Sequence, residues 1–248
     1  PDAVRLPQNA NGRNVRMRPD AFELETLAST TQYGHSFDEW GNYFLVNNSN
    51  HLMHSVIPAE YLDRNAQLVV PRGTSSPPDH GNAAEVFPIT KTPDRQLLTD
   101  VGVMTSACGI TAYAGGAFPE PFNTYTTFVA EPVSNIIHAD KLKPRGSTFV
   151  ASRMSQEREF LASTDMWFRP VNLYIGPDGA LYVVDYYREI IEHPEWLSDE
   201  VINSGRLYNG HDMGRIFRIS SVDAKPVTWT RDLSLGKASD AELLAKLS

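Results

Sequence analysis

The stretch GPDGALYVVD, residues 176–185, reads as a tight turn followed by a buried strand. Pro, Asp and Gly set the turn, and the aromatic and β-branched residues after it favour a strand. Residues 33–57 and 108–142 share this layout with residues 169–220. Each segment reads as a short apolar strand, a turn, a second strand, a polar loop and a third strand. The recurrence predicts an all-β fold built from repeated units.

Fourth strands are expected at residues 84–89 and 148–153, and residues 14–19 and 22–28 read as the last two strands of an earlier unit. Four antiparallel strands per unit are typical of a β-propeller, which usually closes with four to eight blades. The chain therefore reads as about three whole blades plus the end of another. A β-sandwich with similar hairpins is the alternative.

Helical signals are few. Residues 188–205 could form one or two short helices inside an insertion of the third unit. Ser239 followed by Glu242 is a capping box, and the three leucines Leu243, Leu244 and Leu247 form an apolar stripe. We expect two parts: a propeller portion over residues 1–222, and a linker with the start of a helical region over residues 223–248.

Composition restricts the partners. The 248 residues are 41% hydrophobic and 21% charged, with a net charge of -8 and no block of Lys or Arg. This argues against nucleic acid or an anionic membrane surface. The single cysteine, Cys108, excludes an internal disulfide and a multi-cysteine metal site, and we expect it to be a buried small residue. No apolar run is long enough for a membrane span.

Polar residues cluster in the connections predicted to open on one rim of a central channel. In a propeller these are the connections from a fourth strand to the next blade and from a second to a third strand. The predicted rim residues are Gln32, His35, Asn48, Glu131, Asn135, Arg169, Asn172, Asp185 and Arg188. Such donors and acceptors suit a small polar ligand, with paired donors of Arg169 for a carboxylate or quinone oxygen. His35 and Asp185 are the candidates for a catalytic base.

Local roles compete with this interpretation. Asn48 equally suits the closing of a tight turn, and Asp185 equally suits a loop cap or a structural ion pair with Arg188. Four other histidines are expected to have no role. His54, His138 and His211 read as strand or loop residues, and His80 as a solvated residue of a lid-like loop.

Several motifs support a family resemblance. FRPVNLYIGPDGALYVVDYYR, continued by GRIFRIS, resembles the last blade of the six-bladed propellers of the soluble quinoprotein glucose/sorbosone dehydrogenase superfamily. Five motifs in order resemble more closely the membrane-bound dehydrogenase domain of large secreted bacterial multidomain proteins. They are YGHSFDEWGNYFLVNNSNH, DHGNAAEVFPI, TSACGIT, EFLASTDMWFRPVN and DYYREIIEHPEW, and the likeness covers about residues 12–222.

The resemblance implies an extracytoplasmic (periplasmic or secreted) oxidoreductase. It would oxidise a sugar or related alcohol with pyrroloquinoline quinone, with Ca²⁺ as a further cofactor, and pass electrons to a cytochrome c. HEAT-like helical repeats commonly follow such a propeller. Three departures weaken the transfer: Thr31 and Gln32 replace an arginine–asparagine pair, Trp167 replaces a second arginine, and the CxxCH haem motif is absent from this chain.

The alternative to an enzyme is a non-catalytic propeller that binds carbohydrate or protein in a large secreted assembly. In either case about three units would leave apolar faces and strand edges uncovered. We therefore expect the chain not to close a propeller alone. The expected partner is the N-terminal half of the same parent polypeptide, because the first residues read as the outer strands of a blade whose inner strands are missing.

Overall fold

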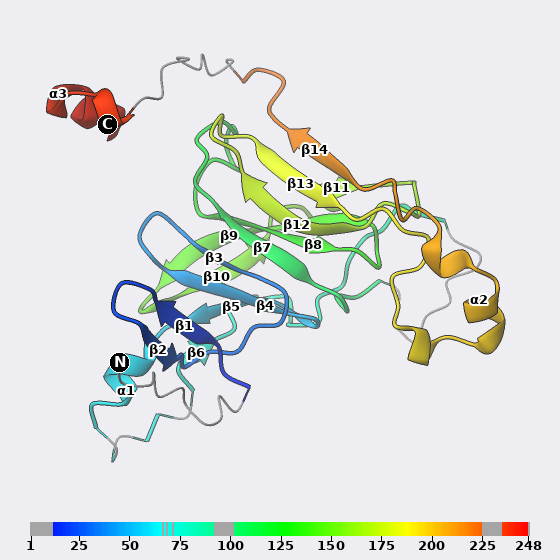
Figure 1. Ribbon diagram of the computed structural model, residues 1–248, viewed down its shortest axis with the longest axis horizontal. Helices are drawn as coiled ribbons and strands as arrows, with labels where there is room; N and C mark the ends of the chain where they lie inside the picture. The colour runs from blue at the N-terminus through cyan, green and yellow to red at the C-terminus, as the bar shows by residue number, and fades with distance from the viewer. Residues whose placement is uncertain are drawn as a thin grey trace.

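The computed structural model describes residues 12–65, 67, 69–70, 72–91, 102–224 and 235–247. Its main elements are antiparallel strands that follow one another in chain order (Figure 1). The first sheet has the order β3-β4-β5-β6. Its strands are β3 (His35–Phe37), β4 (Tyr43–Asn47), β5 (Asn50–Ser55) and β6 (Thr74–Ser75).

The second sheet repeats this meander with longer strands. Its order is β7-β8-β9-β10, and the short β11 also pairs with β9. The strands are β7 (Cys108–Tyr113), β8 (Thr126–Glu131), β9 (Ile136–Arg145), β10 (Thr148–Arg153) and β11 (Leu161–Ala162). Every residue of β7 and β8 is buried, because both faces of this sheet are covered.

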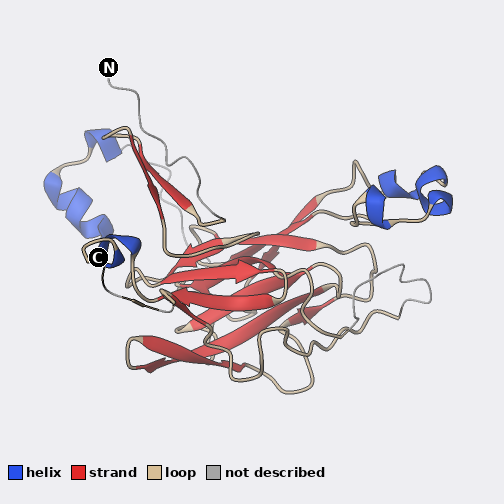
Figure 2. Cartoon of the chain, turned by 90° about the horizontal axis from the view of Figure 1, so that it is seen from below, coloured by secondary structure: helices blue, strands red, loops and turns tan. Residues whose placement is uncertain are grey.

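The third sheet has three strands in the order β12-β13-β14. They are β12 (Pro170–Ile175), β13 (Leu181–Asp185) and β14 (Arg215–Ile219). A separate hairpin joins β1 (Val15–Arg18) to β2 (Glu23–Thr26). Helices are short and lie outside the sheets (Figure 2). They are α1 (Ala59–Leu62), α2 (Asp199–Asn203), α3 (Asp240–Leu247), and 3-10 turns at Pro194–Trp196, Arg206–Tyr208 and Leu235–Lys237.

The first strands of the three sheets lie next to one another, since β7 contacts both β3 and β12. Gly109 permits the close approach of β7 to β12. Its φ is +60°, and an added Cβ would lie 2.6 Å from Cα of Asn172. A glycine is required here both for the left-handed backbone and for the space.

Two hydrophobic cores hold neighbouring sheets together. One joins side chains of the first sheet, such as Phe44 and Leu52, to Val129 of β8. The other joins Phe128 of the second sheet to Leu181 of the third. Alternation along β8 sends Val129 and Phe128 to opposite faces, so the second sheet contributes to both cores.

The all-β prediction is confirmed, as are most of the predicted strands. The expected fourth strand at residues 84–89 is wrong, because β6 at Thr74–Ser75 pairs with β5 instead. Ala84 and Val86 are buried as their pattern suggested, but this segment makes its backbone bonds with residues 102–104. An alternating pattern predicts burial and does not identify the pairing partner.

Helical predictions are confirmed in part. One short helix and a 3-10 turn lie within residues 188–205. The capping box forms, with Ser239 and Glu242 exchanging hydrogen bonds at the start of α3. Leu244 is exposed, whereas the Leu247 side chain and residues 225–234 lie outside the described part. No helix within the described residues is long and apolar enough to cross a membrane.

Candidate metal centre

Three histidines and one aspartate meet between the first and second sheets. His51 lies on β5, His138 and Asp140 lie on β9, and His80 lies in the loop after β6. Residues two apart on a strand share a face, so His138 and Asp140 point the same way. Their neighbours Ile136 and Leu142 belong to the core shared with the first sheet, which fixes that direction.

The imidazoles converge on Asp140 through their Nε2 atoms. His51 Nε2 lies 3.1 Å from Asp140 Oδ2, and His138 Nε2 lies 3.2 Å from Asp140 Oδ1. His80 Nε2 lies 3.6 Å from the same Oδ1. One ligand atom from each of the four side chains lies within 4.8 Å of every other. Together these side chains are called the His₃Asp cluster below.

The opposite ring nitrogen of each histidine faces an acceptor. His51 Nδ1 lies 3.0 Å from the Asn82 carbonyl oxygen, and His138 Nδ1 lies 2.7 Å from Glu159 Oε2. His80 Nδ1 lies 3.1 Å from Asp79 Oδ1. Because a carbonyl oxygen or a carboxylate only accepts, each Nδ1 carries the proton and donates. The Nε2 atoms are then the ones left to bind a ligand at the centre of the cluster.

Further hydrogen bonds hold Asp79 and Glu159, the carboxylates that accept from His80 and His138. Asp79 accepts a hydrogen bond from Ser152 of β10, and its backbone N–H donates to the Ala151 carbonyl at 2.9 Å. Glu159 accepts from the Phe87 backbone N–H at 3.1 Å. Partners of this kind orient metal-binding histidines and fix their tautomers.

The cluster is almost completely enclosed. The His51, His138 and Asp140 side chains are at most 2% exposed, and His80 is 13% exposed. His80 Nε2 is buried and has no hydrogen-bond partner among the described residues. A buried polar atom of this kind is costly unless something binds it.

Charge inside the cluster is strongly shifted. Burial by itself lowers the pKa of His138, but hydrogen bonds to Asp140 and Glu159 outweigh it and raise the pKa to about 9. Burial raises the pKa of Asp140, but the hydrogen bonds from His138 and His51 prevail and hold it well below its usual range. Burial lowers the pKa of His80. The site thus combines a firm carboxylate with imidazoles of unequal basicity.

Three imidazole nitrogens and one carboxylate oxygen match the ligands of a transition metal. Zn²⁺ binds histidine nitrogen at about 2.0–2.1 Å and aspartate oxygen at about 2.0–2.2 Å, usually with four ligands. Ca²⁺ takes six to eight oxygen ligands, so this nitrogen-rich site does not fit the calcium expected from the resemblance.

The predicted rim residues do come from connections that contact one another. Gln32 Oε1 accepts from the Asn48 backbone N–H at 3.1 Å, and the Asn48 carbonyl accepts from Ala107 at 3.0 Å. Glu131 is fully buried and accepts from Thr105 and Ser106, the connection that leads into β7. Burial raises the pKa of Glu131 to about 7, although these hydrogen bonds oppose the shift.

Arg169 and Asn135 join the second and third sheets at this rim. The Arg169 guanidinium donates to the carbonyls of Pro132 and Val133 on one side and of Arg188 and Glu189 on the other. Asn135 donates to the carbonyls of Met166 and Phe168 at 3.1 and 2.6 Å. Both side chains are buried and bind the main chain.

The other predicted rim residues also have local partners. Asp185 accepts from the backbone N–H groups of Arg169 and Tyr187 and forms a two-pronged ion pair with Arg215. Arg188 donates to the carbonyls of residues 187, 210 and 211. Asn172 donates to the Tyr174 hydroxyl at 2.9 Å, and His35 is exposed on β3 beside the rings of Phe37 and Tyr43.

These contacts bear on a quinone cofactor. The Nε, Nη1 and Nη2 atoms of Arg169 all donate to main-chain carbonyls, so this arrangement does not fit a guanidinium that grips a quinone carboxylate. Asp185 is likewise held by Arg215.

The sequence reasoning missed the His₃Asp cluster. It treated His138 as a residue without a role and His80 as a solvated loop residue, and the structure places both in the buried cluster. One local signal existed: in IIHAD, residues 136–140, two ionisable side chains share a face of an otherwise apolar strand. Burial of such a pair requires partners, which only the tertiary structure identifies.

Fold and site together define an all-β domain with a buried histidine–aspartate cluster between two sheets. The chain belongs to the family described as domain of unknown function DUF7133, whose model matches residues 3–223. No curated protein and no solved structure matches the chain.

Proposed function

We propose that this chain is a β-propeller-type domain that binds one divalent transition-metal ion, with Zn²⁺ the best fit, at the His₃Asp cluster. The propeller part rests on the repeated meander and on the first strands β3, β7 and β12, which lie next to one another as innermost strands of adjacent blades would. The metal part rests on the cluster alone.

The main support for the metal is the surroundings of the two ring nitrogens of each histidine: Nδ1 faces an acceptor, and Nε2 faces Asp140 at the centre of the cluster. With Nδ1 as donor, the Nε2 lone pair of His51 would face the Asp140 carboxylate at 3.1 Å, which is repulsive unless a cation lies between them. His138 Nε2 also faces this carboxylate, at 3.2 Å, where either a second ring proton or a metal ion lies between them. One metal ion satisfies all three Nε2 atoms and the carboxylate together.

The competing account protonates the imidazoles instead. It places positive rings in one buried site, with ring centroids 5.1 to 5.5 Å apart. Taking several charges out of water is costly even when they are paired. One dication carries the same positive charge as two imidazolium rings, and it also gives the buried His80 Nε2 a partner, so we favour the metal.

Four protein ligands in a closed site are typical of structural rather than catalytic zinc. His51 comes from the first sheet, His138 and Asp140 from the second, and His80 from the loop between them. The metal would therefore fasten two neighbouring sheets to each other. Oxidation of a sugar or alcohol, transfer of electrons to a cytochrome c and an extracytoplasmic location remain predictions of the resemblance alone.

Titration of the chelator-treated chain with Zn²⁺ against a competing chromophoric chelator tests the proposal. We expect one tight site per chain, lost in His51→Ala and in His138→Ala. His54→Ala is the matched control, because His54 is also buried on β5 but binds Thr148 outside the cluster. Absence of a tight site in the unmodified chain, or its retention in His51→Ala, would overturn the proposal.

A further inference from the structure

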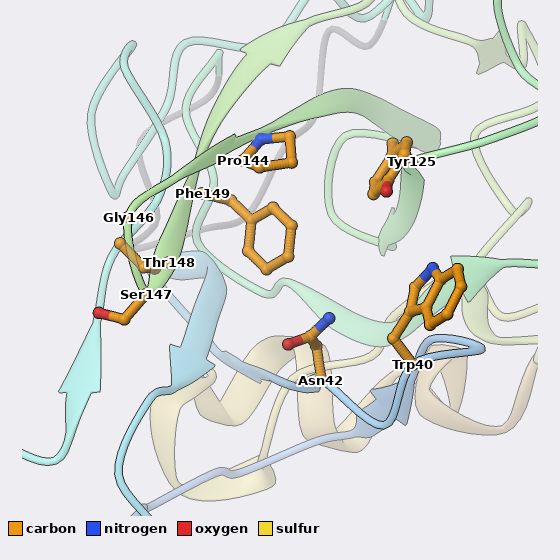
Figure 3. A pocket seen from close by; sticks show the side chains of 8 residues that line it. All are labelled: Trp40, Asn42, Tyr125, Pro144, Gly146, Ser147, Thr148 and Phe149. Atoms are coloured by element: carbon orange, nitrogen blue, oxygen red, sulfur yellow. The ribbon is translucent and has the colours of Figure 1, made fainter.

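A surface groove lies at the end of the sheets opposite to the predicted rim. Trp40 lies in the turn between β3 and β4, Tyr125 directly precedes β8, and Pro144 to Phe149 span the turn between β9 and β10 (Figure 3). Because consecutive connections of a meander alternate between its ends, these turns and the rim connections lie at opposite ends of the sheets. The groove is thus separate from the rim, and none of its lining residues belongs to the His₃Asp cluster.

The groove has the size of a small-molecule site. Its main hollow measures about 390 Å³, within the roughly 300–1,000 Å³ usual for ligand pockets. A second hollow, lined partly by Asp38 and Glu39, shares Trp40 and Tyr125 with the first. This second hollow measures only about 10 Å³, too small for a ligand of its own, so the main hollow is the binding position.

Two large aromatic rings are left exposed at this place. Trp40 is 73% and Tyr125 is 42% exposed, whereas Phe149 is nearly buried. Trp and Tyr combine an apolar ring face with a polar edge, which makes them suited to ligands that are partly apolar and partly polar. Asn42 and Thr148 add polar groups to the lining.

Hydrogen bonds fix the backbone of the turns that carry both residues. Asp38 accepts hydrogen bonds from the backbone N–H groups of Trp40 and Asn42 and from the Asn42 amide, at 2.7–3.0 Å. The Tyr125 carbonyl accepts from Leu142 at 2.6 Å, and Tyr125 has a φ of +48°, in the left-handed region that non-glycine residues rarely adopt. A preformed site loses less conformational freedom on binding.

We infer that this groove binds a neutral saccharide, with a sugar unit in its main hollow. A pyranose ring has an apolar C–H face that stacks on Trp or Tyr, and hydroxyl groups at its edge that bond to amides, hydroxyls and carboxylates. The Glu39 carboxylate and the net charge of -8 disfavour anionic sugars. The main hollow, of about 390 Å³, has room for a sugar unit beside the two rings.

Tryptophan fluorescence and calorimetric titration of the full chain with soluble hexasaccharides test the inference. The probes are the hexasaccharides of glucose, xylose, mannose, galactose and N-acetylglucosamine. We expect at least one to bind, and Trp40→Ala and Tyr125→Ala to weaken that binding roughly tenfold or more, as truncation of a central aromatic anchor does.

Trp196→Ala is the matched control, because Trp196 is 61% exposed but lies in the insertion between β13 and β14. It should leave saccharide binding unchanged. Both tryptophans are exposed, so neither variant is expected to disturb folding, and thermal unfolding verifies this. Failure of all five sugars to bind, or equal affinities for Trp40→Ala and the unmodified chain, would refute the inference.

Discussion

The replacement His51→Ala removes one proposed metal ligand and should abolish stabilisation by zinc. A ligand that binds only the folded chain adds about 4 kcal/mol to the free energy of unfolding at 1,000 times its Kd. In a chain of 150–250 residues each kcal/mol raises Tm by about 2–4 °C. Zinc should therefore raise the Tm of the chelator-treated chain by roughly 8–16 °C.

The structure explains why a single variant suffices. The His51 imidazole is fully buried and connects β5 to Asp140 on β9, so its loss leaves only three of the proposed ligands. Without it the zinc-induced rise should fall to near zero. His54→Ala should retain the full rise, even if its starting Tm is lower, because the comparison is made within each variant.

Circular dichroism monitors thermal unfolding of each protein, once with a chelator and once with excess Zn²⁺. The difference between the two Tm values is the zinc-induced rise, which is compared between His51→Ala, His54→Ala and the unmodified chain. An unmodified chain whose Tm does not respond to zinc would refute the metal centre. A rise in His51→Ala equal to that of the unmodified chain would show that zinc binds elsewhere.

Three further predictions concern folding. Burial raises the pKa of Glu131 from 4.5 to about 7, so its contribution to stability is complete below pH 4.5 and is lost as the pH rises through 7. In urea unfolding, the free energy of unfolding of Glu131→Gln should therefore change by about 3 kcal/mol less over this interval than that of the unmodified chain. An equal pH dependence of the two proteins would contradict the assignment. Gly109→Ala should lower the free energy of unfolding by roughly 1–3 kcal/mol more than Gly146→Ala does in the same assay, because both glycines have a φ of +60° but only Gly109 lies against another backbone. Similar losses in the two variants would refute the close approach of β7 to β12. Arg169→Met should lower the free energy of unfolding by roughly 3–5 kcal/mol, since several buried carbonyls lose their donor; a loss below about 1 kcal/mol would show that these bonds contribute little.

Local signals predicted most strands. In GPDGALYVVD the turn residues and the apolar run occupy the positions that become the β12–β13 connection and β13. The error at residues 84–89 shows the limit of such signals. Ala84 and Val86 are buried next to Met104, which satisfies their pattern, while the two-residue strand β6 is too short to produce a pattern of its own.

Alignment of the three repeats predicted which connections share one end of the sheets, and several of these connections do contact one another. What each side chain binds could not be predicted in the same way. Arg169 looked suited to a ligand, yet its partners are main-chain carbonyls that no sequence pattern identifies. The His₃Asp cluster was missed because His51, His80 and His138 are distant in the sequence and meet only when the two sheets pack.

Anomalous diffraction at the zinc absorption edge, from crystals of the chain grown with Zn²⁺, tests the metal centre most directly. We predict one strong anomalous peak about 2.0–2.2 Å from the Nε2 atoms of His51, His80 and His138 and from a carboxylate oxygen of Asp140. A cluster without anomalous density, in which the imidazoles bond directly to Asp140, would contradict the account.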